Sequence, residues 1–235
     1  MPAPVDPLEL LACADVQVLG RMPWSSNATY LVELCLEGQQ ARAVYKPRRG
    51  ERPLWDFPHG LYRREVAAYL LSEALGWSLV PPTVVREDAP LGEGSLQLFV
   101  EADFEQHYFS LHEARPDLHP QLRRICAFDL VANNTDRKSG HVLLGPDDHL
   151  WAIDNALCFS ADFKLRTVIW EFGGEAVPGP LLADIRRLAG DPPAGLAALL
   201  DDDEIEAVRV RAESVLERER FPIDTTGRRY PWPLV

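Results

Sequence analysis

Two acidic residues in the middle of the chain, Asp136 and Asp154, have the surroundings of a site that handles phosphate. Asp136 lies in an amide-rich polar loop, residues 133–138, which follows a predicted helix. Asp154 ends a short apolar run, residues 150–153, which a Gly-Pro-Asp-Asp turn joins to another apolar run at 142–144. A strand hairpin there would bring both carboxylates to one place. Together they could hold Mg²⁺ and the phosphates of a nucleoside triphosphate.

Two residues earlier in the chain complete a set that could transfer a phosphoryl group. Lys46 closes a predicted strand, and Glu65 lies near the start of a predicted helix. A lysine can bind the α- and β-phosphate oxygens, and a glutamate can hold that lysine in place by an ion pair. Asp136 could then orient and deprotonate an acceptor hydroxyl, and Asp154 could ligate the metal ion.

Each of these residues also has an ordinary structural explanation. A lone lysine can protect an edge strand, a first-turn glutamate complements the helix dipole, and paired asparagines favour turns. Asp154 fits such explanations least, because its carboxylate directly follows an apolar run. The four residues in this order favour a nucleotide site.

The elements that must position these residues can be predicted from hydrophobic spacing. Alternation predicts an antiparallel meander over residues 16–46 with a hairpin at Glu37-Gly38-Gln39, and two further strands at 79–85 and 94–100. Helical spacing predicts a helix over 61–75 that ends at Gly76. The second half is predicted to be helical, over residues 121–132, 181–188, 194–200 and a final segment that Asp201 to Asp203 cap. This change of pattern predicts an α+β protein with two lobes, residues 1–101 and 102–235.

Two polar features in the second half suggest structural roles. Residues 107–120 contain three histidines and two prolines at spacings that suit a metal site poorly, so a solvated loop is expected there. Asp129 falls on the apolar face of its helix, which is costly unless the carboxylate is hydrogen-bonded. We expect it to brace the polar loop that follows.

Segments throughout the chain resemble the phosphoinositide-kinase-like branch of the protein-kinase fold. They are similar in particular to a bacterial, mostly actinobacterial, phosphatidylinositol 3-/4-kinase-like family, through SNATY, AVYKP, ERPLWDFP, REVAAYLLSEALGW, VPPTV, NNTDRKSGHVLL, AIDNALCF, LRTVIW and YPWPLV. The resemblance implies a two-lobed kinase-like fold with an antiparallel sheet in the N-lobe and a mainly helical C-lobe. It implies that Asp136 takes the place of the catalytic aspartate and Asp154 that of the metal ligand.

The sequence departs from the pattern of that family at three places. His141 stands five residues after Asp136, where the family has an asparagine that binds a second Mg²⁺. Mg²⁺ prefers oxygen, so one metal ion, a softer ion such as Mn²⁺, or a contact from His141 to phosphate all remain open. Asn155-Ala156 replaces Phe-Gly. A Gly-rich loop is also missing, so the phosphates would be cradled by Ser25, Ser26 and Asn27.

Two weaker groups of candidates lie outside this set. One group lies where the connection between the lobes could present backbone groups to an adenine ring, although a buried strand end is the alternative: Gln97, Phe99, Val100 and Glu101. Lys164 and Arg166 could contact an anionic substrate or phosphate, and a solvated loop is at least as reasonable.

Composition limits the partners. The net charge is −12 and the pI about 4.9, which opposes binding to nucleic acid and to anionic lipid. The four cysteines have no metal-ligand spacing, and neither a signal peptide nor a membrane span is recognisable, so a cytoplasmic protein is expected.

The sequence thus predicts an ATP-dependent phosphotransferase that uses Mg²⁺, with Mn²⁺ possible. Its acceptor would be a hydroxyl of a protein or small molecule. A nucleotide-binding regulatory module (a pseudokinase) and a nucleotidyl transferase remain as alternatives.

Overall fold

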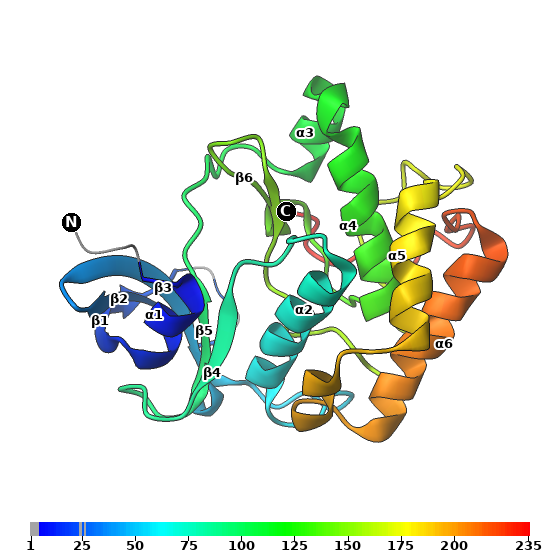
Figure 1. Cartoon of the computed structure of the whole chain (residues 1–235). Helices are drawn as coiled ribbons and strands as arrows, with labels where there is room; N and C mark the ends of the chain where they lie inside the picture. Colours follow the sequence, from blue (N-terminus) through cyan, green and yellow to red (C-terminus); the bar gives the residue numbers. More distant parts are fainter. Residues whose placement is uncertain (1–4, 24, 26) are drawn as a thin grey trace.

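The computed structural model describes residues 5–23, 25 and 27–235 and contains a five-stranded antiparallel sheet at one end of the molecule (Figure 1). Its strands follow the order β1-β2-β3-β5-β4 and are β1 (Asp15–Arg21), β2 (Tyr30–Leu36), β3 (Gln39–Pro47), β4 (Thr83–Arg86) and β5 (Gly94–Leu98). The short helix α1 (Pro7–Cys13) packs against β2, β4 and β5. The predicted meander is therefore confirmed. Its hairpin turns at Glu37 and Gly38, whose φ angles of 51° and 80° suit a tight β-turn.

The position of Lys46 in this sheet depends on a glycine in the neighbouring strand. Lys46 pairs with Ser95 in the register between β3 and β5, and Pro47 pairs with Gly94. A Cβ atom at Gly94 would lie 2.4 Å from the carbonyl oxygen of Lys46. Only glycine therefore allows β5 to approach the end of β3 so closely.

Helices form the other end of the molecule, and a small hairpin lies beside α4 on the side that faces the sheet (Figure 1). The α-helices are α2 (Leu61–Leu75), α3 (Tyr108–Ala114), α4 (His119–Ala132), α5 (Gly179–Gly190) and α6 (Asp202–Arg218). Short 3₁₀ turns cover Arg48–Gly50, Pro116–Leu118, Ser139–His141 and Ala194–Ala198, and the hairpin strands are β6 (Val142–Leu144) and β7 (Leu150–Ala152). Gly76 ends α2 in the left-handed conformation, as predicted.

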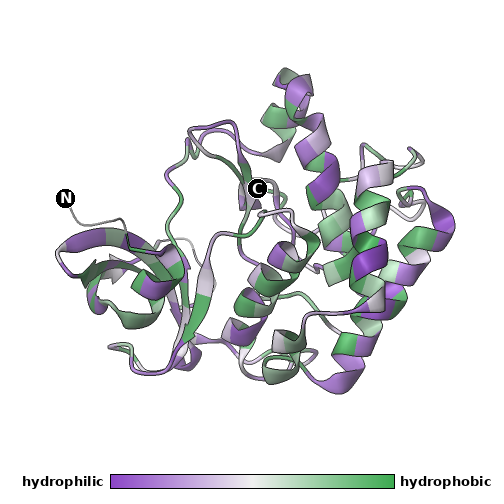
Figure 2. Ribbon diagram, in the orientation of Figure 1, coloured by the Kyte–Doolittle hydropathy of each residue, from purple (hydrophilic) through white to green (hydrophobic). Residues whose placement is uncertain are grey.

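Two separate apolar cores hold these elements. The smaller core lies between the sheet and α1 and includes Leu11, Leu34 and Leu96. The larger core contains the buried faces of α2, α4, α5 and α6, which also carry polar residues on their outer sides (Figure 2). Helix α2 therefore packs its apolar side into the helical core while its N-terminal turn reaches the sheet through Glu65. No helix in the described part of the chain is long and apolar enough to cross a membrane.

The structure differs from the predicted elements in three segments. The helix predicted over 194–200 is a 3₁₀ helix over Ala194–Ala198. Residues 107–120 form α3 and a 3₁₀ turn instead of a loop, because Tyr108, Leu111 and Leu118 are buried in the core. The rings of His112 and His119 stack there, with centroids 4.5 Å apart.

The predicted strand at 79–85 begins only at Thr83. The backbone N–H groups of Leu79 and Val80 donate to the hydroxyl of Ser72 in α2, at 2.7 and 3.3 Å, and the carbonyl of Leu79 accepts from Ala152 in β7. Residues 79 and 80 thus bind α2 and the hairpin instead of the sheet.

Candidate functional site

Lys46 lies at the centre of the candidate site and joins three elements. From the end of β3, its ammonium group donates to the carboxylate of Glu65 in α2 and, at 2.7 Å, to Oδ1 of Asp154 after β7. The second oxygen of Glu65 accepts the backbone N–H of Asn155 at 3.0 Å. Burial alone would lower the pKa of Lys46, but the carboxylates of Asp154 and Glu65 raise it well above its usual value. Lys46 therefore stays charged.

Asp154 has one oxygen committed to Lys46 and a second oxygen that faces His141. The ammonium of Lys46 is the main reason that the pKa of Asp154 lies well below its usual range, so Asp154 is ionised at neutral pH. Its side chain remains 45 % exposed, and its backbone adopts a φ of 57°. Ring nitrogen Nε2 of His141 lies 3.3 Å from Oδ2.

His141 is a neutral imidazole in this environment. Burial lowers its pKa to about 4. Its Nδ1 accepts the backbone N–H of Lys138 at 3.3 Å, so the ring proton belongs on Nε2, which faces Asp154. His141 is thus placed to donate a hydrogen bond to the carboxylate.

Asp136 lies beside Asp154 in the loop that follows α4. Its backbone N–H donates to the side-chain oxygen of Asn134 at 2.9 Å, and its carboxylate is 3.1 Å from the ammonium of Lys138. Burial raises the pKa of Asp136 in spite of Lys138. Asp136 and Asp154 line the same cavity of about 240 Å³, so the sequence-predicted carboxylates do converge.

A buried arginine fixes the loop that carries Asp136. The guanidinium of Arg137 donates to both oxygens of Asp129 in α4, to the carbonyl of Ile153 at 2.6 Å and to Oδ1 of Asn155 at 2.7 Å. The side chains of Arg137 and Asp129 are both fully buried. The expectation that Asp129 braces the polar loop is confirmed. Asn155, the residue that follows Asp154, completes this network.

A larger cavity of about 400 Å³ lies next to Lys46 and Asp154. It gathers most of the sequence-predicted residues, namely Ser25, Lys46, Gln97, Phe99, Val100, His141 and Asp154. Apolar side chains line the rest of it, among them Val44, Leu98, Phe104, Leu143 and Ile153. An apolar cavity with charged groups at one side suits a ligand that has a flat ring and an anionic tail.

Of the other sequence-predicted residues, Glu101 and Asn27 do not line this cavity. Glu101 does not line it, and its carboxylate pairs with Arg42. Asn27 lines two adjoining smaller cavities, and its side-chain oxygen accepts the backbone N–H of Arg52 at 3.0 Å. Ser25 donates from its hydroxyl to the carbonyl of Asn27 at 2.9 Å. Ser26 lies outside the described residues.

The structure also brings to the site a segment that the sequence did not place there. Pro233 and Val235 line a cavity together with Lys138, His141 and Asp154. The carbonyl of Leu234 accepts the backbone N–H of Ser139 at 2.8 Å. The apolar sequence of this tail predicts that it packs on the protein, but contains no signal that identifies the surface it covers.

The carboxylates at this site fit a metal ion that is held partly by a ligand's phosphates. Within the described residues, no group of three His, Cys, Asp or Glu side chains is arranged to bind a metal ion by itself. Mg²⁺ commonly takes one or two carboxylates and completes its shell with phosphate oxygens and water. Asp154 and Asp136 can supply those carboxylates, whereas the proton on Nε2 of His141 must first leave or turn away before that nitrogen could bind a metal.

Comparison with known proteins gives the family. No protein-family model matches the sequence. The Mycobacterium tuberculosis protein Rv2133c is 39% identical, over 95% of this chain and 94% of the relative. The chain belongs to the family of Rv2133c. Phosphatidylinositol 4-kinase gamma 2 of Arabidopsis thaliana is 28% identical, but over only 48% of this chain and 26% of the plant protein.

Solved structures show the fold. A hydra Fam20 structure with sugar has a TM-score of 0.58 and 15% identity, over 90% of this chain and 87% of that one. A Golgi casein kinase with Mn and ADP bound has a TM-score of 0.56 and 14% identity, over 97% and 79% of the two chains. The protein therefore has a kinase-like α+β fold, as the sequence predicted. At 14–15% identity these structures show the fold alone, and the phosphatidylinositol 3-/4-kinase-like family stays a prediction.

Proposed function

We propose that this protein is an ATP-dependent phosphotransferase that transfers a phosphoryl group to a hydroxyl. The observation that carries the proposal is the contact of Lys46 with both Glu65 and Asp154 at the edge of the 400 Å³ cavity. In a kinase-like fold this arrangement suits the binding of a nucleotide's phosphates. A first lobe, residues 1–101 with the sheet and α2, and a mainly helical lobe, residues 102–235, would bind the nucleotide between them.

The side chains would divide the work as follows. The apolar part of the cavity would take the base, with Phe99 and Val100 beside it, and Lys46 would bind phosphate oxygens while Glu65 holds the lysine. Mg²⁺ or Mn²⁺, held by Asp154 with Asp136 nearby, would neutralise charge on the phosphates. Asp136 would orient the acceptor hydroxyl and accept its proton. Its raised pKa makes it a better base than an ordinary aspartate.

The acceptor in this proposal is a protein or a small molecule. The net charge of −12 opposes an anionic membrane surface and nucleic acid. Cys13 and Cys35 are exposed free thiols, which favours a reducing compartment, and we place the activity in the cytoplasm.

A second candidate function is a nucleotide-binding module without transfer activity. The contacts of Asp154 favour it, because Lys46 takes one carboxylate oxygen and His141 faces the other. Both oxygens would have to be released before this carboxylate could bind a metal ion as fully as in an active kinase. The two functions differ in whether the γ-phosphate of ATP is transferred to an acceptor, which labelled ATP can measure.

Thermal unfolding with and without ATP and Mg²⁺ or Mn²⁺ tests the part that both candidates share. A ligand at a hundred times its Kd adds about 2.7 kcal/mol, which raises the Tm by several degrees in a protein of this size. The double variant Lys46→Met with Glu65→Gln should lose this shift. Changing both residues avoids leaving the 1 % exposed Glu65 as an unpaired buried charge.

The matched control is Arg186→Met, which removes an exposed cation from α5, away from the cavity. It should keep the full shift. Absence of a shift in the wild-type protein with either metal would contradict both candidate functions.

A further inference from the structure

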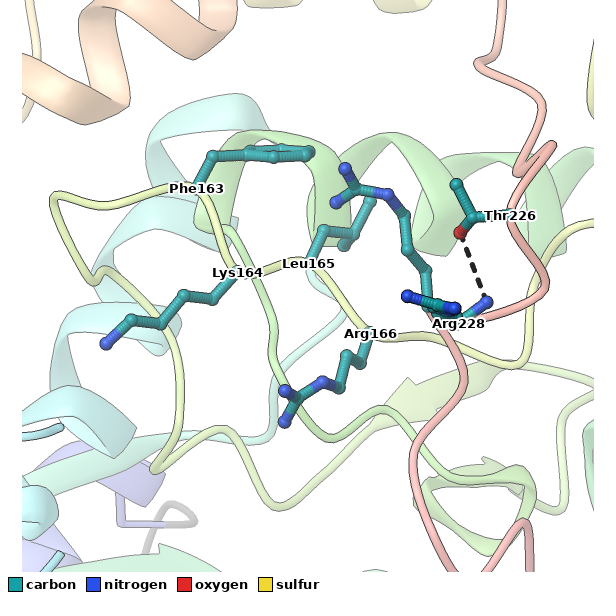
Figure 3. A pocket seen from close by; sticks show the side chains of 7 residues that line it. Phe163, Lys164, Leu165, Arg166, Thr226 and Arg228 are labelled. Carbon is teal, nitrogen blue, oxygen red and sulfur yellow. Dashed lines mark hydrogen bonds between the residues drawn. The ribbon is translucent and has the colours of Figure 1, made fainter. Parts of the chain in front are cut away.

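A second, strongly basic pocket lies on the surface of the helical part (Figure 3). It has a volume of about 620 Å³ and two walls from distant parts of the sequence. Residues 163–166 form one wall and residues 226–229 the other, and Figure 3 shows them on two separate segments of chain. Together they supply four cations: Lys164, Arg166, Arg228 and Arg229.

The two walls are tied together by the backbone of Arg229. Its carbonyl accepts the N–H of Thr167 at 3.0 Å and the indole N–H of Trp170 at 3.2 Å. Its guanidinium lies over the ring of Phe163, 4.9 Å from the ring centre. The pocket is thus built by long-range contacts and not by a chance approach of surface side chains.

An aspartate shapes the wall that contains Arg228. Oδ1 of Asp224 accepts the backbone N–H of Thr226 at 2.9 Å, and Oδ2 accepts the backbone N–H of Arg229 at 3.0 Å. The hydroxyl of Thr226 in turn accepts the backbone N–H of Arg228 at 3.2 Å, which is the dashed line in Figure 3. These bonds hold the loop in place while leaving the arginine side chain of Arg228 exposed.

Two of the four cations have no ion-pair or hydrogen-bond partner among the described residues. Lys164 lies 3.5 Å from the carboxylate of Asp56 and donates to its carbonyl at 2.8 Å. For the side chains of Arg166 and Arg228, by contrast, the described residues provide neither an ion pair nor a hydrogen bond. In a protein with a net charge of −12, these two guanidinium groups in one pocket remain free to pair with an anion from outside.

The pocket adjoins the loop that carries Asp136. The backbone N–H of Arg166 donates to the carbonyl of Asn134 at 2.9 Å, and its carbonyl accepts the N–H of Arg137 at 3.1 Å. Asp136 lies between those two partners in sequence. A ligand bound to Arg166 therefore lies next to the loop that would orient the acceptor hydroxyl.

We propose that this pocket binds a phosphate group that the acceptor already carries. Planar guanidinium groups pair with phosphate oxygens through two parallel hydrogen bonds, which suits Arg166 and Arg228 to this ligand. The acceptor is then a phosphorylated alcohol whose free hydroxyl reaches Asp136. The role as an acceptor site rests on the proposed phosphotransferase function, whereas the binding of phosphate does not.

Amide chemical shifts during a titration with inorganic phosphate test this proposal. In the wild-type protein, with ADP present to fill the nucleotide cavity, residues 163–166 and 226–229 should shift and saturate together. The double variant Arg166→Gln with Arg228→Gln should bind phosphate at least tenfold more weakly. Arg186→Gln, which removes an exposed arginine of α5 that has no ion pair with the described residues, should bind phosphate as the wild type does.

The same titration separates this proposal from the function of the nucleotide site. If ADP shifts no amides near Lys46 but phosphate still saturates the pocket residues, the pocket is confirmed and the phosphotransferase function is contradicted. If the double variant binds phosphate as tightly as the wild type, or phosphate shifts exposed arginines all over the surface equally, the pocket proposal is wrong.

Vesicles identify the source of the phosphate. The wild-type protein is mixed with phosphatidylcholine vesicles that contain phosphatidylinositol 4-phosphate and then sedimented. If the wild-type protein sediments with the vesicles and the double variant does not, the pocket binds a lipid head group. Saturable binding of inorganic phosphate without sedimentation would assign it to a soluble phosphorylated acceptor, which is the expected result for a protein of this charge.

Discussion

At the level of single residues, Lys46 compensates two carboxylates that would otherwise repel each other. Glu65 is 1 % exposed, and Asp154 is held close to it by the same ammonium group. An unpaired charge at the position of Glu65 would cost several kcal/mol. The site is therefore a preassembled ion network in which nucleotide phosphates would take over part of the bonding of Lys46.

His141 makes the stability of the protein depend on pH in a predictable way. Its pKa is about 4 in the folded protein and about 6.5 when unfolded, so between these values only the unfolded chain binds the proton. The free energy of unfolding should fall as the pH falls from 6.5 to 4, by about 3 kcal/mol in total from this residue.

The change His141→Gln should remove that part of the slope. Urea unfolding at several pH values between 4 and 7 measures it, with the exposed His59→Gln as the control that keeps the slope. An unchanged slope in His141→Gln would show that folding does not lower the pKa of this imidazole.

At the level of elements, the site depends on the way α4, the polar loop and the end of β7 are joined. Arg137 makes this join through Asp129, Ile153 and Asn155. The ion pair of Arg137 with Asp129 is fully buried, so removing either partner alone leaves the other as an unpaired buried charge.

The change Arg137→Met should lower the free energy of unfolding by about 3–5 kcal/mol, because it leaves Asp129 as an uncompensated buried charge. The double variant Arg137→Met with Asp129→Leu should recover much of that loss in urea unfolding. It should not recover activity, since Asp136 has lost the brace of its loop. Recovery of full activity in the double variant would contradict a positioning role for Arg137.

Many of the helices and strands, and the charged residues of the candidate site, could be predicted from the sequence. Alternating residues gave the strands before Lys46, and helical spacing with Gly76 gave α2, because both patterns are local. The order of Lys46, Glu65, Asp136 and Asp154 gave the charged centre. The partners of Arg137 could not be predicted, because they come from three segments that meet only in the fold.

Helix α3 shows a second limit of prediction from the sequence, because tertiary burial can override local preference. The prolines and histidines of residues 107–120 favour a loop locally, and burial of Tyr108 and Leu111 overrides that preference. Likewise, residues 226–229 carry no pattern that predicts a pocket shared with Arg166.

At the level of the whole molecule, an extended segment joins β5 of the sheet to α3 of the helical part. Residues 99–107 form no helix or strand, and Phe104 is 63 % exposed although it also lines the 400 Å³ cavity. The connection is therefore accessible, and a nucleotide in the cavity would cover part of it.

Chymotrypsin should cut after Phe104 early in limited proteolysis, and ATP with a divalent metal should slow that cut several-fold. The exposed Leu8 in α1, which lines neither the nucleotide cavity nor the basic pocket, is the internal reference whose cleavage ATP should leave unchanged. Mass spectrometry of the fragments measures both cuts. Equal protection at the two residues would show a global effect and argue against a nucleotide beside Phe104.

The most direct test of the account follows the label of γ-labelled and α-labelled ATP with the purified protein, Mg²⁺ or Mn²⁺, and a mixture of cellular proteins and small metabolites. We predict that γ-label leaves ATP for an acceptor while α-label stays in the nucleotide. Asp136→Asn should lower that rate about a hundredfold or more while nucleotide still raises the Tm. No transfer of γ-label by the wild-type protein with either metal, transfer of α-label instead, or an Asp136→Asn variant as fast as wild type would contradict the account.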